Sequence, residues 1–152
     1  MKLYFDICCY SRFYDDQGQL KIYMESEAIL NIINMAKQNN DEIYGSPALD
    51  LEIDQIEDIE KRDKIKYFYE QTITQKVDYT DKVHNRVIEL AEKTKIRTLD
   101  SFHLSFAEIN CVDILLTTDT RFEKACSKLD LNIKVTNPIK HLMEVIHNDN
   151  ST

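Results

Sequence analysis

The chain has 152 residues, enough for a single domain with its own buried core. Apolar residues make up 43% and charged residues 30%, as in ordinary soluble globular proteins, and no apolar stretch reaches the roughly 18 residues of a membrane span. The net charge is −8, and residues 1–60 alone hold 4 basic and 13 acidic side chains, so the chain is poorly suited to bind nucleic acid through its bulk charge. Any contact with nucleic acid must come from a local basic edge or a bound cation.

The cysteines and the first residues indicate in which cellular compartment the protein resides. Cys8 and Cys9 are adjacent and the other two cysteines are isolated, so the chain has neither a CxxC pair nor the spacing of a zinc site. This pattern does not resemble a secreted disulfide framework. Asp6 interrupts the first apolar run too early for a signal peptide. We therefore expect a cytoplasmic protein without membrane contacts.

The first half of the chain alternates short apolar segments with longer helical ones. Residues 2–5 predict a buried strand, and apolar residues at helical spacing predict a helix over residues 20–39. A second strand is predicted over residues 42–45. Ser46 followed by Pro47 is typical of a helix start, and the charged stretch that follows predicts a helix to about residue 74, with a break near residues 61–63.

The second half continues the alternation. Its predicted elements, in chain order, are a strand at 75–77, a helix at 80–93, a helix from about residue 100, a strand at 114–117, a helix at 121–128, a strand at 133–135 and a helix at 138–146. This order is typical of βαβ units. We predict one domain over residues 1–147, a three-layer α/β/α fold with a mainly parallel central sheet of four or five strands, and a frayed tail over residues 148–152.

Four acidic residues stand where a cation site would need them. Asp6 and Asp119 close predicted strands, Asp100 opens a predicted helix, and Glu52 lies in the helix that begins at Pro47. The carboxyl ends of parallel strands meet at one crevice, and two carboxylates about 4 Å apart repel by roughly 4 kcal/mol at an effective dielectric near 20. A divalent cation would relieve that repulsion. Taken singly, each acid has a plainer interpretation: a helix cap, a turn residue or a solvated surface group.

In this order and context the residues resemble the PIN-domain ribonucleases, which include the VapC-type toxins of prokaryotic toxin–antitoxin pairs. The resemblance spans nearly the whole chain. The segment from Cys8 to Asp16 resembles a stand-alone prokaryotic subgroup of the family rather than a typical toxin. The motifs that carry it are the strand ending in Asp6, Ser46 with Glu52, the helix start Asp-Ser-Phe-His-Leu-Ser-Phe-Ala at residues 100–107, Thr-Thr-Asp-Thr-Arg-Phe at residues 117–122, and Asn-Pro at residues 137–138.

The resemblance implies hydrolysis of RNA phosphodiester bonds with Mg²⁺ or Mn²⁺. Asp6, Asp100 and Asp119 would then hold the cation directly or through water, and Glu52 would orient the attacking water or ligate metal. An RNA substrate, an antitoxin protein and a second copy of the chain are the expected partners. Side chains near these acids are candidates for substrate binding: Arg12, Lys95, Arg97, Thr117 and Arg121.

Two positions leave alternatives open. The family has Thr or Ser after its first Asp, whereas this chain has Ile7, which removes a hydroxyl from the surroundings of the cation and favours a weakly active or inactive module that binds protein. His103 lies three residues after Asp100 on one helical face, and a packing or surface role is favoured over ligation. A phosphatase or phosphoacceptor on a similar sheet ranks last, because Asp6-Ile7-Cys8 lacks the second Asp of the DxD phosphatase pattern.

Overall fold

Five parallel strands form the centre of the computed structural model, which describes residues 1–150. The strand order is β3-β2-β1-β4-β5. The strands are β1 (Lys2–Phe5), β2 (Glu42–Gly45), β3 (Gln75–Lys76), β4 (Ile114–Leu116) and β5 (Lys134–Thr136). All four neighbouring pairs are parallel. The predicted α/β fold with a sheet of up to five strands is confirmed.

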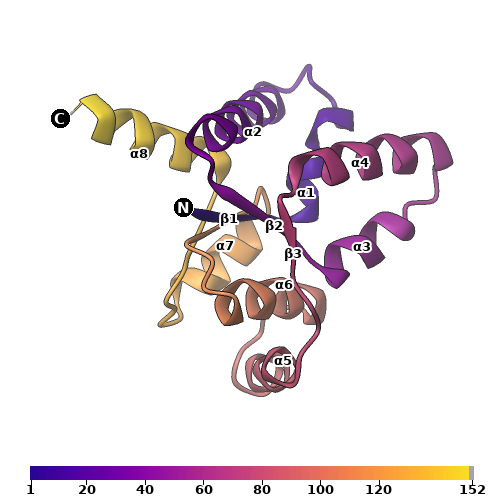
Figure 1. Ribbon diagram of the computed structural model, residues 1–152, viewed down its shortest axis with the longest axis vertical. Coiled ribbons are helices and arrows are strands. Elements are labelled where there is room, and N and C mark those ends of the chain that lie inside the picture. Colours follow the sequence, from indigo (N-terminus) through magenta and orange to yellow (C-terminus); the bar gives the residue numbers. More distant parts are fainter. Residues whose placement is uncertain (151–152) are drawn as a thin grey trace.

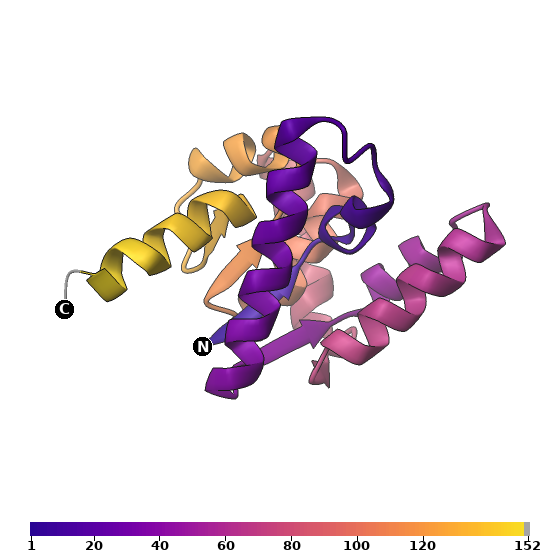
Figure 2. The ribbon, with the colours of Figure 1, turned by 90° about the horizontal axis from the view of Figure 1, so that it is seen from above.

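Helices cover both faces of the sheet. They are α1 (Ile7–Ser11), the 3-10 turn η1 (Arg12–Tyr14), α2 (Leu20–Asn39), α3 (Pro47–Asp54), α4 (Ile59–Thr72), α5 (Asp81–Lys93), α6 (Thr98–Ile109), α7 (Thr120–Ser127) and α8 (Pro138–Asn150). Figure 1 shows α2, α4 and α8 on one side of the sheet and α5 and α6 on the other. Figure 2, turned by 90°, shows α8 lying beside α2, and these two helices contact each other. The predicted three-layer arrangement is thereby confirmed.

The two central strands are apolar because they are covered on both faces. Leu3, Tyr4 and Phe5 of β1 are at most 2% exposed, and all of β4 is buried. A parallel strand between two helical layers is expected to read as an apolar run rather than as an alternation. The edge strand β3 has only two residues, both exposed, which fits its weak signal in the sequence.

The order of the strands reverses direction at β1. From β1 the chain moves outward to β2 and β3 and then returns to β4 on the opposite side of β1. In open α/β sheets, ligands bind beyond the carboxyl ends of the two strands that flank such a reversal. Asp6 follows β1 directly, and residues 117–119 follow β4. The acids that close these two strands are therefore neighbours, although they are 113 positions apart in the numbering.

The elements depart from the prediction in three places. The break in the charged helix falls at residues 55–58 rather than 61–63, because Asp58 starts a new helix by accepting a hydrogen bond from the Lys61 amide. The short helix α1 was not predicted. The last helix continues through residues 148–150, which we expected to be frayed, and the rest of that expected tail lies outside the described residues. Among residues 1–150, no helix has both the length and the apolar character needed to cross a membrane.

Candidate metal centre

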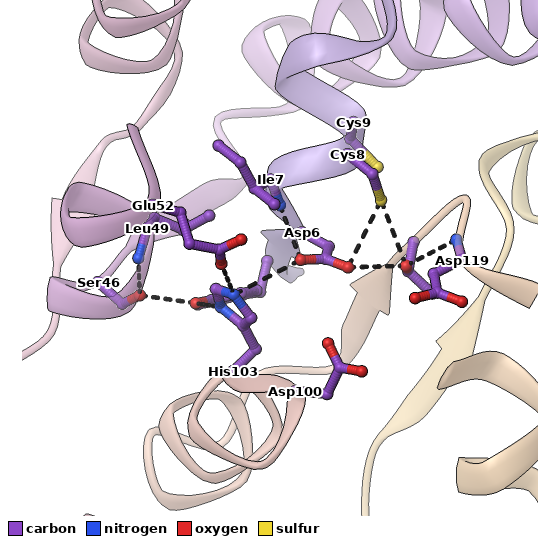
Figure 3. Close-up of polar contacts among 12 residues, drawn as sticks. Asp6, Ile7, Cys8, Cys9, Ser46, Leu49, Glu52, Asp100, His103 and Asp119 are labelled. Carbon is purple, nitrogen blue, oxygen red and sulfur yellow. Dashed lines mark hydrogen bonds and ion pairs between the residues drawn. The ribbon is translucent and has the colours of Figure 1, made fainter. Parts of the chain in front are cut away.

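Asp6 lies at the centre of the site. Its side chain is 6% exposed and caps α1 by accepting a hydrogen bond from the Ile7 amide at 2.8 Å. The two carboxylate oxygens face different neighbours. Oδ1 lies 3.6 Å from Nε2 of His103, whereas Oδ2 accepts a 2.8 Å hydrogen bond from the Thr117 hydroxyl. Figure 3 shows Asp6 between Glu52 and His103 on one side and Asp119 on the other.

Glu52 is held by a buried chain of hydrogen bonds. Its carboxylate is bonded to Nε2 of His103, whose Nδ1 lies 2.6 Å from the Tyr4 hydroxyl. The Tyr4 hydroxyl in turn lies 2.6 Å from Oγ of Ser46, the residue that caps α3 by accepting from the Leu49 amide. The chain therefore ties α3 to β1 and α6. It orients the Glu52 carboxylate toward Asp6.

Asp100 and Asp119 supply the other side of the cluster. Asp119 caps α7 through Oδ1, which accepts from the Arg121 and Phe122 amides, and its Oδ2 accepts a 3.1 Å hydrogen bond from Arg97. The Asp100 side chain is 17% exposed, and Figure 3 shows it pointing toward Asp6. Burial and the negative charges of Asp6 and Asp119 raise the pKa of Asp100 from 3.8 to about 6. The cluster therefore carries strong repulsion when all of its acids are ionised.

The hydroxyl that the sequence lacks at position 7 comes from another strand end. Thr117 follows β4, is 1% exposed and donates to Asp6 at 2.8 Å. Its oxygen also accepts from the Asp119 amide at 3.1 Å, so one side chain orders two of the acids. The Cys8 thiol lies 3.5 Å from Asp6 and accepts from the Thr118 amide. Position 7 therefore offers no hydroxyl, whereas Thr117 places one on the Asp6 carboxylate.

The donor set fits a divalent cation. Asp100 lies close enough to Asp6 and Asp119 for their negative charges to raise its pKa, although donor atoms of these three acids do not all lie within 4.8 Å of one another. Hard cations such as Mg²⁺ and Mn²⁺ prefer oxygen ligands of this kind. One nitrogen joins the oxygens: single atoms of Asp6, Glu52 and His103 lie within 4.8 Å of one another.

The five residues expected to bind substrate have different surroundings in the structure. Arg97 lies at the site, is 65% exposed on its side chain and pairs with Asp119. Lys95 and Arg121 are exposed and make no ion pair within the described residues. Thr117 is buried on Asp6 rather than presented to solvent. Arg12 directs its guanidinium at Glu25 and Asp15, away from the four acids.

Two polar residues of the site had little or no signal in the sequence. Tyr4 lies inside an apolar strand and reads as a core residue, and its ring is indeed fully buried. His103 was expected to pack or to lie at the surface; it is 1% exposed, but both ring nitrogens have polar partners. Helical spacing from Asp100 was the only signal that placed His103 near the acids. No local pattern pairs Tyr4 with it.

Comparison with solved structures shows the same fold. A chain in the crystal structure of VapBC2 from Rickettsia felis, bound to a DNA fragment from their promoter, aligns over 90% of this chain and 98% of that chain, with a TM-score of 0.59 and 17% identity. A chain of FitAcB from Neisseria gonorrhoeae aligns over 90% and 97%, with a TM-score of 0.58 and 14% identity. No protein-family model and no curated protein matches the sequence. The chain therefore has a PIN-like, VapC-like fold, as the motifs indicated.

Proposed function

We propose that the protein is a metal-dependent endoribonuclease that hydrolyses RNA phosphodiester bonds. The observation that carries the proposal is that Asp6 and Asp119, which follow β1 and β4, both raise the pKa of Asp100 in α6, while Glu52 is held beside Asp6. Like charges that lie close together and are partly buried destabilise the protein unless a cation neutralises them. Open α/β sheets bind their ligands beyond the carboxyl ends of the strands, which supports this location for the site.

In this proposal the acids have separate tasks. Asp6, Asp100 and Asp119 would hold Mg²⁺ or Mn²⁺, and the chemistry supplied by such an ion would be a more acidic water and neutralisation of charge on the phosphate oxygens. Glu52 orients the attacking water, because its carboxylate is fixed by His103 and faces Asp6. Thr117 keeps the Asp6 carboxylate in place through its hydroxyl. These residues act as one unit, so loss of a single acid should remove most of the activity.

A basic edge beside the acids would bind the phosphate backbone. Arg97 is exposed and already lies within hydrogen-bond distance of Asp119, and a guanidinium matches the geometry of a phosphate. Lys95 and Arg121 are exposed and free of ion pairs within the described residues. In an acidic protein these few cations would have to supply the local attraction for RNA. Arg12 is not part of this surface, because its charge is used by Glu25.

We further propose that the enzyme is the toxin of a toxin–antitoxin pair. The sequence motifs resemble VapC toxins, and the VapBC2 and FitAcB structures share the fold. Exposed apolar side chains on α2 and α4, among them Leu20, Tyr23 and Tyr67, offer a surface for a protein partner. A second copy of the chain is the other expected partner. Light scattering of the protein alone and after co-expression with its neighbouring gene product would distinguish these assemblies.

The second candidate function is a catalytically weak module that acts by protein binding. Ile7 at the position of the family's hydroxyl favours it, as does the net charge of −8. The two candidates differ in their response to cations. The nuclease requires Mg²⁺ or Mn²⁺, whereas the binding module predicts no Mn²⁺-dependent rise in Tm.

Cleavage of a fluorescent RNA panel tests the proposal. Wild type is expected to cut RNA with Mg²⁺ or Mn²⁺ and to stop when EDTA is added. Asp119→Asn keeps an oxygen that can cap α7 but loses the charge, and it should lower the rate by at least about 100-fold. Asp130→Asn, an exposed acid outside the cluster, serves as the matched control and should cut like wild type. Metal-dependent cleavage that is equal in all three proteins would refute the assigned site.

A further inference from the structure

His103 faces the centre with a nitrogen that can bind metal. Its imidazole is 1% exposed, and Nε2 points at the Glu52 carboxylate and lies 3.6 Å from Asp6 Oδ1 (Figure 3). The three donor atoms come from α6, α3 and the end of β1 and lie within 4.8 Å of one another. Ligand distances of about 2.0–2.2 Å place two ligands of one ion at most about 4.4 Å apart, so these three donors can share an ion after small shifts of their side chains.

The opposite ring nitrogen has the partner that a metal-binding histidine needs. Nδ1 lies 2.6 Å from the Tyr4 hydroxyl, which itself lies 2.6 Å from Ser46 Oγ. A hydroxyl can accept from Nδ1–H and donate onward to Ser46, which leaves the Nε2 lone pair directed at the two carboxylates. A second hydrogen bond of this kind fixes the tautomer of metal-bound histidines.

The same contacts permit a purely structural interpretation. If Tyr4 donates to Nδ1, then Nε2 carries the proton and donates it to Glu52, and His103 only positions that carboxylate. Both hydroxyls can act as donor or acceptor, so the chain of hydrogen bonds can run in either direction. The two readings differ in what happens on adding a cation that accepts nitrogen ligands. Such a cation would displace the proton between Nε2 and Glu52 into solvent.

We propose that His103, Glu52 and Asp6 form a second cation site of mixed nitrogen and oxygen ligands, which selects borderline ions such as Co²⁺ or Zn²⁺ over Mg²⁺. Asp6 would be common to this site and to the proposed site with Asp100 and Asp119, because its two oxygens have different neighbours. Imidazole suits Co²⁺ and Zn²⁺, whereas Mg²⁺ prefers oxygen. The inference rests on the proposed function insofar as both take the same carboxylates to be cation ligands.

Calorimetry and Co²⁺ absorption spectra test the second site. His103→Gln preserves a polar group that can reach Glu52 but removes the imidazole. It is expected to weaken Co²⁺ and Zn²⁺ binding at least about tenfold and to change the visible Co²⁺ bands, while Mg²⁺ affinity stays within about twofold. Tyr4→Phe should weaken Co²⁺ binding about tenfold through the loss of the Nδ1 partner. His84→Gln, which alters an exposed histidine, is the matched control and should bind like wild type. Equal Co²⁺ affinity and spectra in wild type and His103→Gln would overturn the proposal.

A measurement on wild type covers the case in which the variants do not fold. In protein with ¹⁵N-labelled histidine, diamagnetic Zn²⁺ should shift the Nε2 resonance of His103 and hold the proton on Nδ1. An unchanged His103 signal at saturating Zn²⁺ would contradict ligation. RNA cleavage in Mg²⁺, assayed on the same samples, separates the two claims. Zn²⁺ ligation by His103 without RNA cleavage supports this site and contradicts the nuclease, whereas cleavage without His103 ligation does the reverse.

Discussion

Asp100→Asn should make the metal-free protein more stable. In the folded protein the pKa of Asp100 is raised from 3.8 to about 6, first by burial and then by the charges of Asp6 and Asp119. A carboxyl whose folded pKa exceeds its unfolded value destabilises the fold once it is ionised. The penalty is absent below pH 3.8, grows between pH 3.8 and 6, and is complete above pH 6. Asparagine has a similar shape and carries no charge, so it removes the penalty.

The size of the effect follows from two opposing contributions. One pKa unit corresponds to about 1.4 kcal/mol, so the shift of Asp100 amounts to about 3 kcal/mol. Asp100 also lies in the first turn of α6, where a negative charge stabilises the helix by about 0.3–1 kcal/mol. The repulsion is therefore the larger contribution, and the net gain is about 2 kcal/mol. For a chain of this size that is a rise in Tm of about 4–8 °C.

Thermal unfolding in EDTA at pH 7.5 and at pH 4 measures this gain. The stabilisation by Asp100→Asn should be present at pH 7.5 and nearly lost at pH 4. Asp81→Asn is the matched control, because Asp81 is exposed in the first turn of α5 and lies outside the cluster. It loses the same helix contribution and should be neutral or slightly destabilised. An Asp100→Asn variant that is less stable than wild type at pH 7.5 would refute the argument from charge repulsion.

Three further predictions follow from the contacts. Arg12→Met should lower the free energy of unfolding by about 3 kcal/mol in chemical denaturation, because it leaves the fully buried Glu25 without its cation. RNA cleavage per folded molecule should not change. A loss of cleavage at normal stability would show that Arg12 belongs to the site. Gly45→Ala should cost about 1–3 kcal/mol in the same assay, because its Cβ would overlap the Tyr69 hydroxyl and Ile73, and an unchanged Tm would show that these side chains move aside freely. Mn²⁺ affinity measured by calorimetry should fall as the pH drops below about 6, where Asp100 holds a proton that the cation must displace, and a flat profile between pH 7.5 and 5 would contradict its role as a ligand.

The sequence was informative where the signal is local. Apolar segments predicted the central strands β1 and β4, whereas the signal for the exposed edge strand β3 was weak, and the Ser46–Pro47 start predicted α3, which Ser46 caps. The position of Asp6 after a buried strand and of Asp119 after another predicted that the two would be near each other, because parallel strands end at the same edge. The predicted position of the break after α3 was wrong. Asp58 caps the next helix, but it lies in a segment with several acids and no proline or glycine, so the sequence did not single it out.

The remainder depends on contacts between distant segments. Tyr4 and His103 lie 99 positions apart, and only the packing of α6 against β1 brings the hydroxyl to Nδ1. Thr117 was expected to contact substrate, yet the return of the chain to β4 puts its hydroxyl on Asp6. Arg12 was expected near the phosphate, but α2 presents the buried Glu25 to it. A buried charge is costly to leave unpaired, so a nearby side chain of opposite charge pairs with it. The sequence does not show which charges are buried.

A thermal-shift titration with Mn²⁺ on wild type and Asp6→Asn tests the cation centre most directly. Asparagine retains an oxygen that can cap α1 but removes the charge that both sides of the cluster share. At a free Mn²⁺ concentration of about 100 times the Kd, binding should stabilise wild type by about 2.7 kcal/mol, a rise in Tm of about 5–10 °C. The account predicts that rise in wild type and its loss in folded Asp6→Asn. An equal shift in both proteins, or no shift in wild type, would contradict it.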